Sequence, residues 1–101
     1  MDEESQLYDE IAEGEEAERI FKSPVFVKSI KRVEETYTML WKSPAATAEA
    51  RESYWARIQA LGDVLIALNA VKQAGKVASS KAEAVARRDG GATNRNARSG
   101  K

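Results

Sequence analysis

The chain of 101 residues contains neither cysteine nor histidine. The lack of cysteine excludes disulfides, thiolate metal sites and cysteine nucleophiles. The lack of histidine removes the side chain that most often serves as a general base near neutral pH and as a metal ligand. Glu34, Glu35, Glu49 and Glu52 could form an acid/base pair, but on amphipathic helices such residues are normally solvated. We therefore expect a non-enzymatic protein with no cofactor, no metal site and no small-molecule substrate.

Long hydrophobic runs are also missing. Runs such as Val64-Leu65-Ile66-Ala67-Leu68 fall far short of the roughly 20 apolar residues that a membrane-spanning helix needs. The first residues, Met1-Asp2-Glu3-Glu4, are acidic, whereas a secretory signal begins with basic residues. We expect a soluble protein of the cytoplasm with no membrane partner.

Proline occurs only twice, each time within the string Lys-Ser-Pro, at residues 22–24 and 42–44. A proline fits the first position of a helix, and a serine before it can cap that helix with its hydroxyl oxygen. Proline also disfavours a helical conformation for the residue before it. We predict that each Ser-Pro ends one helix and begins the next. No similarity extends beyond the string, and a phosphorylation signal would rest on the Ser-Pro dipeptide alone.

Apolar residues spaced four and three apart follow both Ser-Pro pairs, as expected for two amphipathic helices. The first stripe predicts a helix over residues 24–42, and the second predicts a helix over 45–74. Gly75 follows the second stripe, and glycine is the residue most often found just past a helix end. The stripes consist of Phe26, Ile30, Val33, Tyr37 and Leu40, and of Tyr54, Ile58, Leu61, Leu65 and Leu68.

The predicted fold is all-α, with an antiparallel helical hairpin over residues 23–78 as its core, because a short link favours antiparallel neighbours. A weaker helix is predicted within the acidic segment 1–22, where Gly14 interrupts the apolar pattern at a cost of about 1 kcal/mol. The basic segment 79–101 is predicted to be largely disordered, since its glycines and polar residues leave little to bury.

The net charge of zero conceals a strong polarity along the chain. Residues 1–18 hold nine acidic side chains and no basic one, and residues 72–101 hold eight basic side chains against two acidic ones. Such asymmetry is typical of chains whose ends contact charged partners. The alternatives are that the ends keep a small apolar middle in solution, or that they attract each other between neighbouring subunits.

The second predicted helix carries more apolar surface than a hairpin needs. Trp55 and Ile66 are eleven residues apart and therefore lie at nearly the same angle around the helix, away from the stripe of Leu61, Leu65 and Leu68. Gly62 between them would let another helix approach closely. We predict that Trp55, Gly62 and Ile66 form an interface of a homo-oligomer. The alternative is that the first helix covers them with Leu7, Ile11 and Phe21.

The basic end is the second candidate site. Flexible arginine and lysine arms bind phosphates by releasing counterions, without reading the base sequence. We predict that five residues contact nucleic acid or an acidic partner: Arg87, Arg88, Arg95, Arg98 and Lys101. No aromatic residue is interleaved for base stacking, and no helix-turn-helix pattern is visible. The alternative is a solvated terminal tail.

One stretch of the sequence resembles a known group of proteins. Leu40-Trp41, Arg51-Glu52, Trp55 and the closing Gly75-Lys76-Val77-Ala78 are similar to motifs of small helical accessory proteins of tailed bacteriophages, over about residues 20–78. The resemblance implies an oligomeric component of head assembly or DNA packaging, in the virion or the host cytoplasm, that contacts DNA or another phage protein. It transfers no catalytic or binding residue. The alternative is a small phage inhibitor or adaptor that binds a host protein through the acidic N-terminus.

Overall fold

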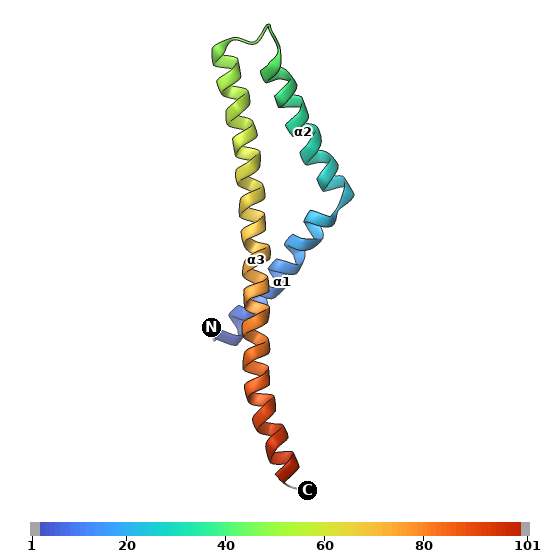
Figure 1. Cartoon of the computed structure of the whole chain (residues 1–101), viewed down its shortest axis with the longest axis vertical. Helices are drawn as coiled ribbons and strands as arrows, with labels where there is room; N and C mark the ends of the chain where they lie inside the picture. Colours follow the sequence, from blue (N-terminus) through green and yellow to red (C-terminus); the bar gives the residue numbers. More distant parts are fainter. Residues whose placement is uncertain (1–2, 100–101) are drawn as a thin grey trace. The chain divides into compact units, whose positions relative to one another are not determined.

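A computed structural model describes the backbone of residues 3–99 and the side chains of residues 3–88. It contains three helices, α1 (Glu3–Lys22), α2 (Pro24–Lys42) and α3 (Ala48–Ser99), and no strand among the described residues (Figure 1). The all-α prediction is confirmed. The described helices divide between two compact units. Unit 1 comprises Met1–Glu16 and Val71–Lys101, and unit 2 comprises Ala17–Ala70, so α1 and α3 each contribute to both.

The first Ser-Pro pair acts as the sequence predicts. The Ser23 backbone N–H donates to the carbonyl of Ile20 at 3.0 Å, which closes α1. The Ser23 hydroxyl accepts the backbone N–H of Phe26 at 3.4 Å, and Pro24 occupies the first position of α2. The rings of Phe21 and Phe26 meet edge to face across this break, with 6.2 Å between their centroids.

The second Ser-Pro pair ends α2 but does not begin α3, so this part of the prediction is wrong. Ser43 is the C-cap of α2, and its hydroxyl accepts the backbone N–H of Ala45, two residues on, at 3.2 Å. The hydroxyl therefore stabilises a turn and does not cap the next helix. The cap of α3 is Thr47 instead, whose hydroxyl accepts the N–H of Ala50 at 3.0 Å.

Gly75 does not end a helix either, because α3 continues through it to Ser99. No glycine among the described residues has a positive φ, so Gly75 is not in the left-handed conformation of a helix C-cap. The predicted disorder of residues 79–101 is not confirmed, since the helix as described extends over most of them. Gly14 likewise lies inside α1 rather than at a break.

Unit 1 is built on a contact between these two glycines, which we call the glycine contact. A Cβ atom placed on Gly14 would lie 2.7 Å from the Cα of Gly75, and one on Gly75 would lie 2.7 Å from the Cα of Gly14. The backbones of α1 and α3 therefore touch with no side chain between them, which only glycine permits. Leu7 and Ala78 are buried in the same unit, with 7% and 1% of their surface exposed.

Unit 2 contains both predicted apolar stripes, and they meet at a pair of tyrosines. The stripe on α3 is half-buried, and on α2 Val33 and Leu40 are both 40% exposed, with no fully buried residue in that helix. The rings of Tyr37 and Tyr54 join the two helices, with centroids 6.1 Å apart. The Arg57 guanidinium lies 5.3 Å from the Tyr37 ring centroid and donates to the Tyr37 hydroxyl at 3.2 Å.

Candidate interaction surfaces

The predicted oligomer interface contains two large exposed apolar residues on the part of α3 that belongs to unit 2. Trp55 is 53% exposed and Ile66 is 69% exposed. A Cβ atom placed on Gly62 would meet nothing within 4 Å, so the chain itself makes no close approach there. Leu7 and Ile11 belong to unit 1 and Trp55 and Ile66 to unit 2, so the alternative in which the first helix covers these residues also stays a prediction. The structure leaves their role as a subunit contact a prediction.

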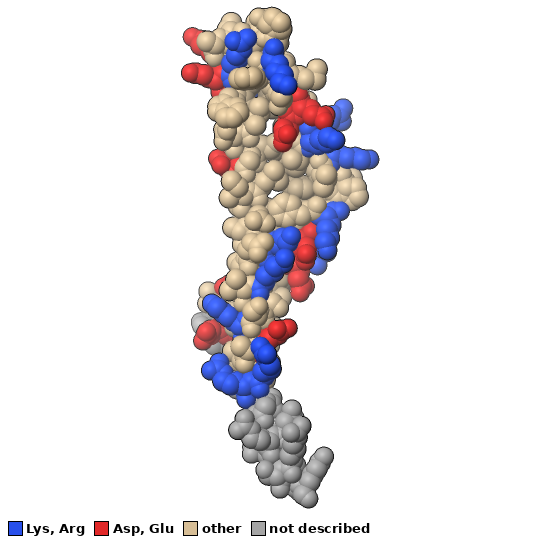
Figure 2. Space-filling model, viewed as in Figure 1, with Lys and Arg blue, Asp and Glu red and all other residues tan. Residues whose placement is uncertain are grey.

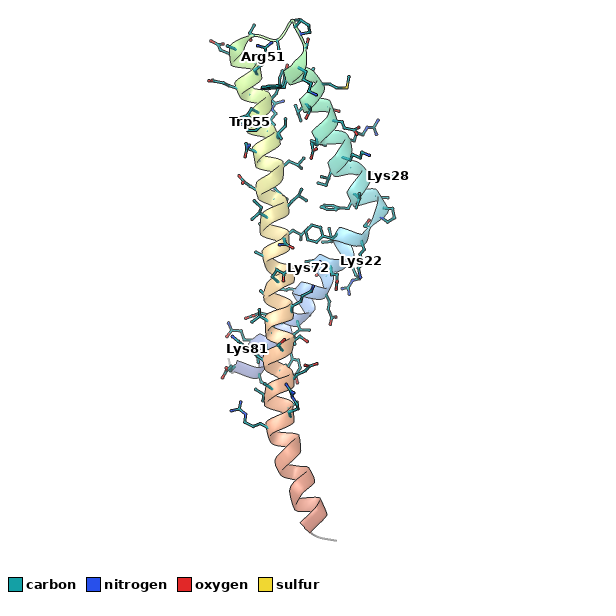
Figure 3. All side chains as sticks on the ribbon, in the orientation of Figure 1. Lys22, Lys28, Arg51, Trp55, Lys72 and Lys81 are labelled. Carbon is teal, nitrogen blue, oxygen red and sulfur yellow. The ribbon has the colours of Figure 1, made fainter. Side chains whose placement is uncertain are left out.

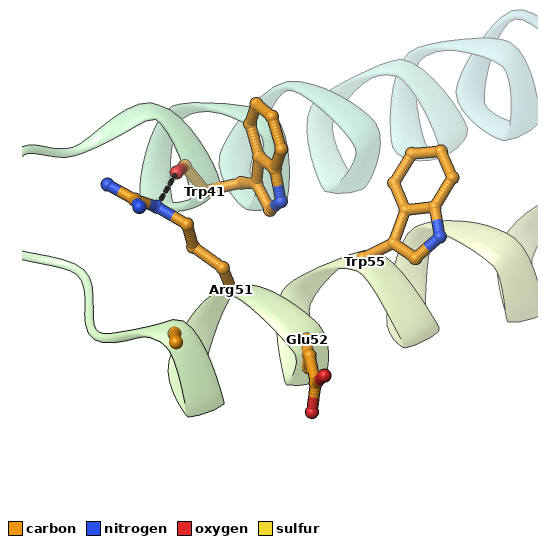
Figure 4. Close-up of a pocket in the computed structure, with 5 residues that line it drawn as sticks. Trp41, Arg51, Glu52 and Trp55 are labelled. Carbon is orange, nitrogen blue, oxygen red and sulfur yellow. Dashed lines mark hydrogen bonds between the residues drawn. The ribbon is translucent and has the colours of Figure 1, made fainter.

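Trp55 also lines a groove that the sequence does not signal, which we call the tryptophan groove. It lies between α2 and α3 near the link of residues 43–47, has a volume of about 570 Å³, and is formed by Trp41, Ala48, Arg51, Glu52 and Trp55 (Figure 4). A second hollow of about 210 Å³ adjoins the same two tryptophans and includes Glu34, Thr38, Lys42 and Ile58. Trp41 is 42% exposed, so both indoles remain accessible.

Arg51 holds the end of α2 beside this groove. Its Nε donates to the Trp41 carbonyl at 3.2 Å (Figure 4). Its Nη2 donates to the Ser43 carbonyl at 3.4 Å. The last carbonyls of a helix lack partners within the helix, and a cation is favoured beside them. A guanidinium can serve two carbonyls at once because its donors form a planar fork. No sequence pattern marks an arginine that caps a neighbouring helix, which is why this role was missed.

Unit 1 brings the acidic start of the chain together with the basic segment that begins at Val71. Residues 3–16 carry seven carboxylates and no basic side chain, and residues 71–88 carry five basic side chains and Glu83. Acidic and basic side chains lie next to one another on the visible face of this unit (Figure 2). Attraction between the ends of neighbouring subunits was one alternative for these charges, and the structure brings the two segments together within one chain.

The residues of the predicted basic contact are only partly described. Arg87 and Arg88 are exposed. Arg95 and Arg98 belong to the last turns of α3, but their side chains, like all of Lys101, lie outside the described residues. A contact with nucleic acid or an acidic partner therefore stays a prediction, for which the structure supplies two accessible arginines.

The remaining candidate groups lie apart. Glu34 and Glu35 are exposed on α2, and Glu49 and Glu52 are exposed on α3. Within the described part of the chain, no group of three or more acidic residues is placed to hold a metal ion. None of the described helices has an apolar stretch sufficient to cross a bilayer.

Comparison of the chain with known protein families, with characterised proteins and with solved structures finds no match. The resemblance to bacteriophage accessory proteins therefore rests on the residues quoted for it and stays a prediction. The surfaces described above are the basis for any statement about function.

Proposed function

We propose that this chain is a non-enzymatic assembly protein that self-associates through its exposed apolar surface on α3. In this proposal α2 and the first part of α3 form an antiparallel helical hairpin, and Trp55, Gly62 and Ile66 pack against another copy. The observation that carries the proposal is that Trp55 and Ile66, both large and apolar, are more than half exposed on one side of one helix. Soluble proteins seldom leave such surfaces uncovered.

The small amount of buried material supports self-association. Among residues 3–88 the buried ones are Leu7, Gly14, Ala17, Gly75 and Ala78, and Leu7 is the one large side chain among them. A core this small supplies little stability, and oligomerisation is one of the usual ways to add to it. A second copy covering Trp55 and Ile66 would bury apolar surface that the single chain leaves in water.

The context we propose is that of a bacteriophage accessory protein in head assembly or DNA packaging. The support is the resemblance over residues 20–78 together with the basic residues from Lys72 onward. In this role the basic end contacts DNA or another virion component through charge.

Replacing Ile66 with Glu tests the interface. A carboxylate in a desolvated subunit contact costs several kcal/mol unless the structure relaxes. We expect the mass in solution, measured by light scattering or sedimentation, to fall to that of a smaller species while helical content by circular dichroism is kept. Leu65→Ala is the control, because Leu65 lies on the half-buried stripe and should lower stability without removing the subunit contact.

Two outcomes would contradict the proposal. A parent chain that is monomeric at every concentration tested would remove the basis for self-association. An Ile66→Glu variant that keeps both the mass and the melting temperature of an oligomeric parent would show that the surface of Trp55 and Ile66 is not the contact.

A second candidate is a small phage inhibitor or adaptor that binds a basic host protein. The observation in its favour is that six of the seven carboxylates on residues 3–16 are exposed, with Glu10 the half-buried exception. A run of accessible carboxylates on one helix can imitate the charge of a nucleic acid. Capture of a host enzyme that depends on residues 1–18, together with no binding of DNA, would favour this candidate over the first.

A further inference from the structure

We propose that the acidic first half of α1 is an autoinhibitory segment, which competes with nucleic-acid phosphates for the basic side chains of α3 in the same chain. This inference rests on the proposed contact between the basic end and DNA, and it adds a means of regulating that contact. It follows from two features of unit 1: the glycine contact and the opposite charges that this contact brings together.

The glycine contact fixes where the two segments meet. Besides the 2.7 Å approach to the Cα of Gly75, a Cβ on Gly14 would lie 3.3 Å from the carbonyl oxygen of Val71, and one on Gly75 would lie 3.0 Å from the carbonyl oxygen of Glu10. The backbone of α1 at Glu10 and Gly14 therefore touches the backbone of α3 at Val71 and Gly75. The burial of Leu7 extends the packing of α1 for two more turns toward its N-terminus.

Acidic residues flank this contact on α1, and basic residues flank it on α3. Glu10 and Glu13 lie within about one turn of Gly14 on α1, and Lys72 and Lys76 lie within about one turn of Gly75 on α3. Lys81 follows on α3 (Figure 3). The exposed Arg87 and Arg88 come after it in the segment that belongs to unit 1. The Debye length at physiological salt is about 8 Å, so opposite charges that come within this distance across the contact attract each other despite the screening.

A polyanion that approaches α3 meets these carboxylates as well as the basic side chains. The carboxylates repel its phosphates, and they reduce the positive potential that binding by counterion release requires. When α1 separates from α3, this repulsion is removed and the full set of basic side chains becomes available. The acidic segment therefore weakens DNA binding while the glycine contact is closed, and a partner that draws α1 away would strengthen it.

Two full-length variants remove the inhibition in different ways. Gly14→Leu forces α1 away from α3, because a side chain there meets backbone. The pair Glu10→Gln and Glu13→Gln keeps the glycines and the helix but removes two carboxylates beside the contact. The matched control is Glu34→Gln with Glu35→Gln, which makes the same change in net charge on α2, in unit 2. Circular dichroism checks that each variant remains helical.

The measurement is the affinity for a short fluorescent DNA duplex, by anisotropy, at low and at physiological salt. We expect both test variants to bind about five- to tenfold more tightly than the parent, and the control to differ from the parent by about twofold or less. The salt dependence of Gly14→Leu should be steeper, by about 0.9 in the logarithmic slope for each additional phosphate contact.

The outcomes separate the inference from the proposed function. Test variants that bind no more tightly than the parent, or a control that gains as much as they do, would overturn the autoinhibitory role while the DNA contact stands. If neither the parent nor any variant binds DNA at low salt, the proposed DNA contact is wrong and the inhibition falls with it.

Discussion

Gly14→Ala offers the most direct test of the structure, since it adds one methyl group where two helix backbones meet. Alanine is favoured over glycine inside a helix by about 1 kcal/mol, so α1 alone would gain stability. The new Cβ, however, would lie 2.7 Å from the Cα of Gly75. Carbon atoms prefer separations of about 3.5–4.0 Å, so the helices must part by about 1 Å.

The clash is expected to outweigh the gain in helix propensity. Overpacking of this kind costs about 1–3 kcal/mol and sometimes more, and here the atom that is met belongs to backbone, which cannot rotate away. We expect a cost near the upper end of this range and a net loss of about 2 kcal/mol in the free energy of unfolding. Urea unfolding followed by circular dichroism measures it.

Gly62→Ala is the matched control, because it places the same methyl group inside a helix with nothing within 4 Å. It should gain about 1 kcal/mol at concentrations where every variant is monomeric, because in the proposed oligomer Gly62 packs against another copy. Gly75→Ala should lose as much as Gly14→Ala, and the double variant should lose less than the sum, since helices that have already parted accommodate the second methyl group. If Gly14→Ala is as stabilising as Gly62→Ala, the glycine contact does not exist.

Three further comparisons of variants test local features of unit 2 by denaturant unfolding. Ser23→Ala removes the cap of α2 and should cost about 1 kcal/mol, whereas Ser43→Ala should cost about 0.5 kcal/mol or less, so equal costs would contradict the different roles of the two serines. Arg51→Ala should lower the free energy of unfolding by about 0.5–1.5 kcal/mol. Arg51→Lys should lower it nearly as much, because an ammonium does not reproduce the planar fork that donates to two carbonyls. An Arg51→Lys variant as stable as the parent would refute this. Tyr37→Phe loses the hydrogen bond from Arg57 but keeps the ring, so it should lower the free energy of unfolding by about 1 kcal/mol or less. Tyr37→Ala should lower it clearly more, because it also loses the contact with Tyr54.

The sequence predicts a helix well where both of its ends carry local signals. The bounds of α2 follow from Ser23-Pro24 at one end and Ser43-Pro44 at the other, and the structure places them as predicted. The start of α3 lies three residues later than predicted, because the Ser43 hydroxyl can accept a hydrogen bond either within a turn or as the cap of a following helix. The sequence does not reveal which it takes, and Thr47 offers an equally good cap.

Gly75 shows the limit of local reasoning. A glycine after an apolar stripe can end a helix in the left-handed conformation, or it can let another backbone approach. The partner that decides between these is Gly14, which is remote in the sequence and was itself interpreted as an interruption of a helix. The charges present the same difficulty, since the sequence shows their segregation but not that both signs share unit 1.

The glycine contact also bears on the order in which the chain can fold as it is synthesised. Gly14 and Gly75 are 61 residues apart (75 minus 14), whereas Trp41 and Arg51 are ten apart and Tyr37 and Tyr54 are seventeen apart. Contacts between near neighbours close small loops and form early, and a contact across most of the chain must wait for the loop between its partners to close. The nascent chain can therefore bring α2 and the start of α3 together while the acidic half of α1 still has no α3 segment to pack on. During that interval the same acidic helix is open to any basic partner that it meets first.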